Sequence, residues 1–255
     1  MNPILHDLQN KRWIWTATNA KQQAAKTLLE TGFESLDNVL TGGFPRAGMI
    51  HLNSLLGCGE IRFILSVLQH QHTVSIEHKL NIFINPPFDL NAEFLLAQKV
   101  ALKQLIVVRT TQQNDALWSA EQCAKSGACR AIFLWQRKLK HTQVRKIEHA
   151  ALQGDCYCIW LDSYIPYGQQ NLPNSVKSDL PRDLPRNLPL SLSLSISRQA
   201  DTLTIKVNKQ KVGWAQKAVK VPLPFSSRTN SSFKHHLDQA LINDVNKVVS
   251  IHANR

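Results

Sequence analysis

The stretch TGFESLDNVLTGGFPRAGMIHLNSLLGCGEI, residues 31–61, decides the fold. Its first part predicts a short helix over Phe33–Leu40 that ends at a pair of glycines. An apolar strand, Met49–Leu52, follows and leads into a loop over residues 53–59, and a helix is expected from Glu60 to His70. A strand that runs through a glycine-containing loop into a helix is typical of an α/β domain.

Strands and helices continue to alternate as far as Asp162. Further strands are predicted at 81–85, 105–109, 131–135 and 156–161, and further helices at 92–101, 115–126 and 142–153. The strands are apolar throughout rather than on alternate residues, which indicates burial on both faces. The sequence therefore predicts an α/β fold with a mostly parallel central sheet and helices on both of its faces.

The alternation of apolar strands and helices ends after Asp162, and the sequence becomes rich in proline. Residues 163–189 contain two copies of Asp-Leu-Pro-Arg, at 179–182 and 183–186, and this proline content excludes a helix interior and a central strand. We expect a flexible loop there. Leu190–Ser197 and Thr202–Asn208 then alternate between apolar and polar residues, which predicts an antiparallel hairpin at the sheet edge.

The two ends of the chain are expected to lie outside the α/β domain, which we assign to residues 31–223. Residues 1–30 form an N-terminal segment with a predicted helix over 3–15. Residues 224–255 form a basic tail with a possible amphipathic helix over 233–249. The apolar anchors of that helix would be Phe233, Leu237, Leu241, Val245 and Val248.

Charge and composition restrict the class of protein. The formal net charge is +12, and nine basic against two acidic residues lie between Lys206 and Arg255. Such an excess attracts nucleic acid or an acidic protein surface. No stretch approaches the roughly 20 apolar residues of a membrane span, and the first 18 residues do not resemble a signal peptide. We expect a cytoplasmic protein without membrane contact whose five cysteines are reduced and mostly buried.

The spacing of Thr31-Gly32, Leu36-Asp37, Gly42-Gly43, Pro45 and Gly48 before a strand resembles the start of the core of the RecA recombinase family. In that family the strand leads into a phosphate-binding loop, G-x-x-x-x-G-K-[ST], whose lysine and hydroxyl hold phosphates and magnesium. Here the eight residues run from Ser54 through Gly57 and Gly59 to Glu60 and Ile61. Glu60 replaces the lysine and Ile61 the hydroxyl, and a carboxylate near phosphates is repulsive by at least about 1 kcal/mol.

This chain also lacks two further residues that RecA-like enzymes require for ATP hydrolysis. RecA-like enzymes carry a catalytic glutamate after the second strand, where this chain has Asn85-Pro86-Pro87. The acidic residue that orients magnesium would fall on Trp135. Without the lysine, the metal ligands and the water-activating acid, phosphoryl transfer has no machinery. We expect no enzyme activity, no metal and no cofactor, and nucleotide binding is disfavoured. The interpretation that we favour for Gly57 and Gly59 is a tight turn without a ligand.

Residues 117–135, LWSAEQCAKSGACRAIFLW, resemble the signature of the ImuA family, which is related to RecA and to the cell-division inhibitor SulA. The resemblance covers roughly residues 3–223. It implies a role in the bacterial SOS response to DNA damage, in mutagenic translesion synthesis beside ImuB and an error-prone polymerase, and a contact with RecA. The Leu-Pro-Arg repeat departs from the RecA pattern in the region of a DNA-contacting loop, so that contact is not transferred to Arg182 and Arg186.

Two other functions compete with this interpretation. A SulA-like division inhibitor would bind FtsZ, which the region 117–135 supports, but SulA-like proteins are shorter. A non-specific DNA-binding module is the second alternative, and its affinity for DNA would fall steeply as the salt concentration rises. Its phosphate contacts would be Lys206, Lys209, Lys211, Lys217 and Lys220. The helix over 233–249 could dock either in a groove of a partner or on its own domain.

Overall fold

The computed structural model describes residues 28–74, 79–164, 187–211, 218–224 and 250–252. The predicted helices over 3–15 and 233–249 lie outside the described residues, as does most of the predicted proline-rich loop. Among the described residues, no helix combines the length and the apolar character needed to cross a membrane.

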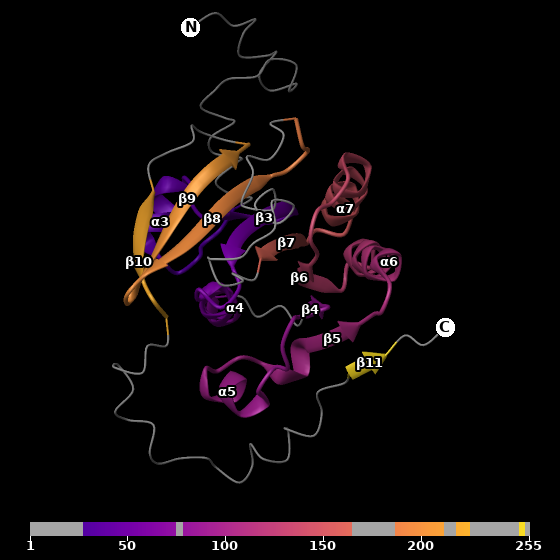
Figure 1. The fold of residues 1–255 in the computed structure, drawn as a ribbon, viewed down its shortest axis with the longest axis horizontal. Helices are drawn as coiled ribbons and strands as arrows, with labels where there is room; N and C mark the ends of the chain where they lie inside the picture. The colour runs from indigo at the N-terminus through magenta and orange to yellow at the C-terminus, as the bar shows by residue number, and fades with distance from the viewer. Residues whose placement is uncertain (1–27, 75–78, 165–186, 212–217, 225–249, 253–255) are drawn as a thin grey trace, which may run out of the picture.

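The centre of the molecule is a nine-stranded sheet in the order β10-β9-β8-β3-β7-β6-β4-β5-β11 (Figure 1). Its strands are β3 (Gly48–Leu55), β4 (Leu80–Ile84), β5 (Leu105–Arg109), β6 (Cys129–Trp135), β7 (Tyr157–Tyr164), β8 (Leu192–Gln199), β9 (Thr202–Gln210), β10 (Val219–Pro222) and β11 (Ser250–His252). All neighbours from β8 to β11 pair in parallel, whereas β9 is antiparallel to β8 and to β10. The predicted mostly parallel sheet is confirmed.

The strand order separates this sheet from the common dinucleotide-binding arrangement. In that arrangement the first two strands are neighbours, but here β7 and β6 lie between β3 and β4. A second sheet consists of only β1 (Leu28–Leu29) and β2 (Phe44–Pro45), which pair antiparallel. The arrangement is an α/β fold compatible with a RecA-like domain.

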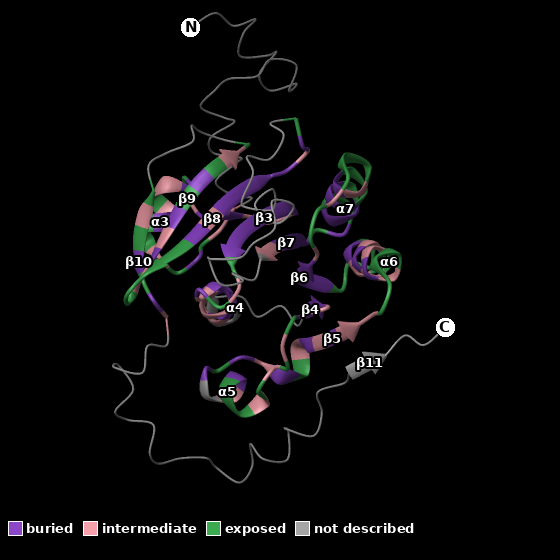
Figure 2. Cartoon of the chain, viewed as in Figure 1, coloured by how far each residue is buried: buried purple, intermediate pink, exposed green. Residues whose placement is uncertain are grey.

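Helices cover both faces of the sheet, as the sequence predicts (Figures 1 and 2). The first core cluster joins the sheet to α3 (Glu34–Val39), α4 (Glu60–Val74) and α5 (Ala92–Ala97), and the second joins it to α6 (Gln113–Lys125) and α7 (His141–Gln153). Every residue of β6 is buried, and its apolar run over 131–135 contacts both layers of helices. On α6 the buried residues are Ala116, Ala120 and Ala124, and their small side chains allow the helix to approach the sheet closely.

A buried carboxylate on α7 fastens this helix to the start of two strands. The side chain of Glu148 is 6% exposed and accepts hydrogen bonds from the backbone N–H of Met49 and from the Ser191 hydroxyl, the latter at 2.9 Å. The Lys211 ammonium lies 2.6 Å from the same carboxylate. One side chain of α7 thus satisfies groups from β3 and from the segments that flank the β8–β9 hairpin.

Three sequence predictions are corrected by the structure. The antiparallel hairpin forms, but it is not the outermost part of the sheet, because the short strand β10 lies outside β9. The helix expected to reach Ala101 ends at Ala97, since Lys99 adopts a left-handed backbone with φ of 57°. Finally, Asp162 does not end its strand: β7 continues to Tyr164, so the first two residues of the predicted loop are strand.

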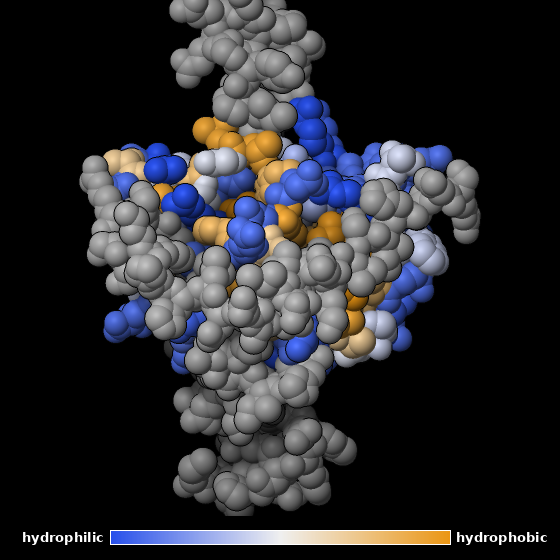
Figure 3. All heavy atoms as spheres, turned by 90° about the horizontal axis from the view of Figure 1, so that it is seen from below, coloured by the Kyte–Doolittle hydropathy of each residue, from blue (hydrophilic) through white to orange (hydrophobic). Residues whose placement is uncertain are grey.

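On the face shown in Figure 3, apolar residues form small groups between hydrophilic ones, which is normal for a folded domain. Four large apolar side chains are exposed among the described residues: Leu55, Phe94, Trp118 and Leu152.

Candidate functional site

The loop after β3 lies at the carboxyl edge of the parallel sheet, where α/β proteins commonly bind ligands. It spans residues 56–59 and leads directly into α4 at Glu60. Gly59 has a φ of +116°, and a Cβ atom there would lie 2.7 Å from Leu223 Cδ1 and 3.1 Å from Leu203 Cδ2. Only glycine suits this position, both for its backbone angle and because leucines from the β9–β10 region cover it.

The decisive feature of the loop is the direction of the Glu60 side chain. Its carboxylate turns back and accepts hydrogen bonds from the Gly57 N–H at 2.9 Å and from the Gly59 N–H at 3.0 Å. Glu60 is 1% exposed. Backbone N–H groups at the start of a helix attract anions, and here an anion from the chain itself takes two of them.

The other residues of the loop support a closed structure. The Ser54 hydroxyl is buried and lies 3.2 Å from the Ser163 hydroxyl of β7, and Ile61 packs against the first core cluster. Burial raises the pKa of the Cys58 thiol to about 12, and the negative charge of Glu60 contributes to this increase. The thiol therefore stays protonated at neutral pH beside the carboxylate.

The neighbouring strand ends are occupied by structural contacts. After β4, the Asn85 amide donates to the Thr110 hydroxyl at 2.9 Å and its oxygen accepts from the Thr110 N–H at 2.7 Å. The Arg109 guanidinium donates to the carbonyl oxygens of Pro86 and Phe88 at 3.1 and 3.0 Å. These bonds tie the end of β4 to the end of β5. The resemblance to RecA-like enzymes expects a catalytic glutamate at this place, after β4.

Trp135 at the end of β6 is also part of the core. Its ring is 7% exposed and lies 5.4 Å from the ring of Phe83 and 6.1 Å from that of Phe88, between centroids. The indole N–H is buried and has no hydrogen-bond acceptor among the described residues. A large apolar ring thus fills the place where the resemblance expects a magnesium-orienting acid.

A serine, a histidine and an aspartate meet across β8, β3 and β7. His51 Nδ1 lies 3.1 Å from the Ser193 hydroxyl, and His51 Nε2 lies 3.9 Å from an Asp162 oxygen. The three residue types resemble a hydrolytic triad, but His51 and Ser193 are both buried within the sheet. The hydroxyl has no access to a substrate, so we interpret the contacts as structural. Among the described residues no three His, Cys, Asp or Glu side chains form a metal-binding group.

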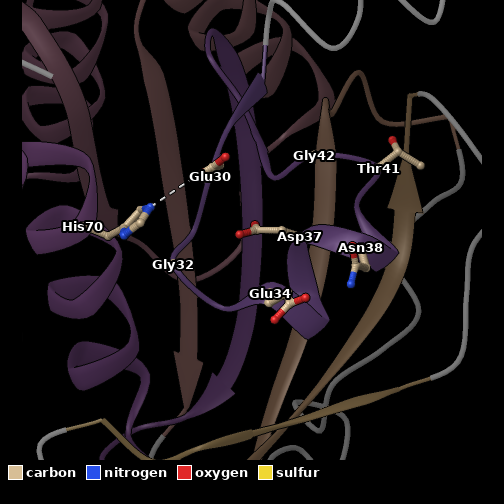
Figure 4. Close-up of a pocket in the computed structure, with 8 residues that line it drawn as sticks. All are labelled: Glu30, Gly32, Glu34, Asp37, Asn38, Thr41, Gly42 and His70. Atoms are coloured by element: carbon tan, nitrogen blue, oxygen red, sulfur yellow. Dashed lines mark hydrogen bonds and ion pairs between the residues drawn. The ribbon is translucent and has the colours of Figure 1, made fainter. Parts of the chain in front are cut away.

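The motif that precedes β3 has a structural role as well. The Asp37 carboxylate accepts from the backbone N–H and the hydroxyl of Thr31, at 2.9 and 2.7 Å. Beside it is a hollow of about 460 Å³ in which Glu30 points toward His70, 3.4 Å away (Figure 4). A Cβ atom on Gly32 would lie 2.9 Å from the His70 ring, so the glycine allows α4 to pack closely. The motif holds the start of the domain against α3 and α4.

The proposed DNA-contacting lysines differ in their contacts. Lys211 is bound to Glu148, and the Lys209 ammonium donates to the Leu188 carbonyl. Lys206 and Lys220 are exposed on β9 and β10, and Lys217 lies outside the described residues. The partner-binding candidates between Phe233 and Val248 also lie outside them.

Sequence reasoning missed a surface between α6 and α7. Trp118 on α6 is 63% exposed. A groove of about 400 Å³ lies between α6 and α7, and its first lining residue follows Trp118 by three positions. The groove is lined by Glu121, Lys125, Thr142, Arg145, Lys146 and His149. The position of Trp118, two residues from each of Ala116 and Ala120, places it opposite the buried face of a helix, and this spacing could have indicated its exposure.

Comparison with known proteins adds no relative: neither a family model nor a curated protein matches the chain. The functional assignment therefore depends on residues and geometry.

Proposed function

We propose that the protein is a non-catalytic, RecA-like accessory factor that binds protein partners. The observation that carries the proposal is the Glu60 carboxylate, which accepts the hydrogen bonds of Gly57 and Gly59 at the start of α4. A nucleoside triphosphate would have to displace this carboxylate or place its phosphates beside a buried negative charge. Either arrangement is unfavourable for binding.

The neighbouring positions support the same proposal. Catalysis of phosphoryl transfer requires cations and acids around the phosphates. The corresponding places are filled by the Asn85–Thr110 hydrogen bonds and by the buried Trp135 ring. We therefore propose a domain that keeps the shape of an ATPase without hydrolysing ATP.

The biological role that we propose comes from the resemblance to the ImuA family. It is a cytoplasmic role in SOS-induced mutagenic translesion synthesis, with ImuB as the main partner and RecA and the error-prone polymerase as further partners. The region that carries the resemblance, 117–135, spans most of α6 and all of β6. An inactive domain could still dock through such faces onto other proteins without an ATP cycle.

Co-purification tests this role. We expect the full chain to retain ImuB and not FtsZ. Loss of ImuB by a chain that ends at Pro224 would place the contact in the basic tail. Thermal melting of both chains controls for folding. Retention of FtsZ without ImuB would contradict the translesion role and favour division inhibition.

A further inference from the structure

We propose that the groove between α6 and α7, together with Trp118, docks an acidic segment of a partner protein that carries an apolar side chain. The inference deepens the proposed partner-binding function and rests on it. It depends on two observations: an exposed tryptophan on α6 and an excess of cations in the groove.

The tryptophan is not needed by the fold. The core-facing side of α6 consists of alanines spaced four residues apart, and Trp118 lies on the opposite side with 63% of its surface exposed. Burial of an exposed aromatic side chain of this size in an interface would be favourable, because it removes a large apolar area from water. Tryptophan and arginine are the residues most enriched where binding energy concentrates in protein interfaces.

The groove carries more positive than negative charge. Lys125 forms an ion pair with Glu121 at 2.6 Å, within α6. On α7, Arg145 and Lys146 also line the groove, and among the described residues neither forms an ion pair. His149 and Thr142 add hydrogen-bonding groups. The two unpaired cations are therefore available to carboxylates of a partner, which would also speed association.

The charge pattern of the groove favours a protein over nucleic acid as the occupant. The Glu121 carboxylate interrupts the line of cations, whereas proteins that bind single strands align an uninterrupted basic groove with several stacking aromatics. An exposed tryptophan near cations suits a segment that alternates acidic and apolar side chains.

Binding measurements on the full chain test the surface. The variants are Trp118→Ala and the double charge reversal Arg145→Glu/Lys146→Glu. The matched controls are Phe94→Ala, an exposed aromatic on the other side of the sheet, and Lys206→Glu/Lys220→Glu, two exposed lysines of the β9–β10 region. The probes are ImuB and a fluorescent peptide of alternating glutamate and leucine residues, with a single-stranded dT20 oligonucleotide as comparison.

We expect both surface variants to weaken binding of ImuB and of the peptide by about thirtyfold or more. The controls should stay within about twofold of the parent, and melting temperatures should be unchanged because none of the replaced side chains is buried. Equal binding of ImuB by all variants would overturn this surface but leave the proposed function intact.

The remaining outcomes also separate the two proposals. If ImuB fails to bind the parent while the peptide binds and the surface variants lose it, the surface stands and ImuB is the wrong partner. If neither probe binds the parent, the inference is wrong. Binding of dT20 that disappears in the surface variants would likewise overturn it, in favour of a nucleic-acid site.

Discussion

Replacement of Glu148 by alanine is expected to lower the free energy of unfolding by about 3 kcal/mol. The variant leaves the buried Met49 N–H and the Ser191 hydroxyl without their acceptor and removes the partner of Lys211. For a chain of this size the melting temperature should fall by roughly 6–12 °C, which thermal and urea denaturation can measure.

The control for this change is Glu121→Ala, which removes a carboxylate whose ion pair with Lys125 lies on the surface of α6. A pair of that kind contributes about 0.5 kcal/mol or less, so the control should melt close to the parent. A Glu148→Ala protein that also melts within about 2 °C of the parent would show that the buried carboxylate does not hold α7 to the sheet.

Replacement of Glu60 by alanine should have two effects on the loop after β3. The N–H groups of Gly57 and Gly59 lose their acceptor, which should lower stability by roughly 2 kcal/mol. The same N–H groups then become available to an external anion. Inorganic phosphate at about tenfold above its dissociation constant would restore roughly 1.4 kcal/mol, and thermal melting with and without phosphate measures this recovery.

The matched variant is Glu60→Gln, which keeps the size of the side chain and one acceptor oxygen but removes the charge. Its stability should lie between those of the parent and Glu60→Ala, and its response to phosphate should be smaller. Chloride at equal ionic strength corrects for general salt effects. A phosphate response of the parent as large as that of Glu60→Ala would show that the carboxylate does not occupy the anion site.

Much of the fold could be predicted from local sequence, because buried parallel strands appear as apolar runs. The run in β6 and the helix that follows the glycine-containing loop were both located in this way. The pairing of β8 with β3 could not be predicted, because it joins residues more than 100 positions apart, which no local pattern records. The three-residue strand β11 is too short to have a recognisable pattern.

The site was predicted in part. The replacement of lysine by Glu60 is visible in the sequence, but the side chain was expected only to repel phosphates, whereas it bonds to the loop itself. That geometry depends on the backbone angles of Gly57 and Gly59 and on cover by Leu203 and Leu223. The anchoring by Glu148 escaped notice because its partners lie 43 to 99 residues away in the chain. The partner helix anchored by Phe233 stays a prediction.

The most direct test of the central claim is a calorimetric titration of the purified full chain with magnesium ATP, paired with an assay for phosphate release. With Glu60 holding the loop N–H groups, we expect no saturable binding up to millimolar nucleotide and no release of phosphate above the blank. Saturable binding in the micromolar range, or ATP turnover that the Glu60→Ala variant alters, would contradict a self-occupied, non-catalytic loop.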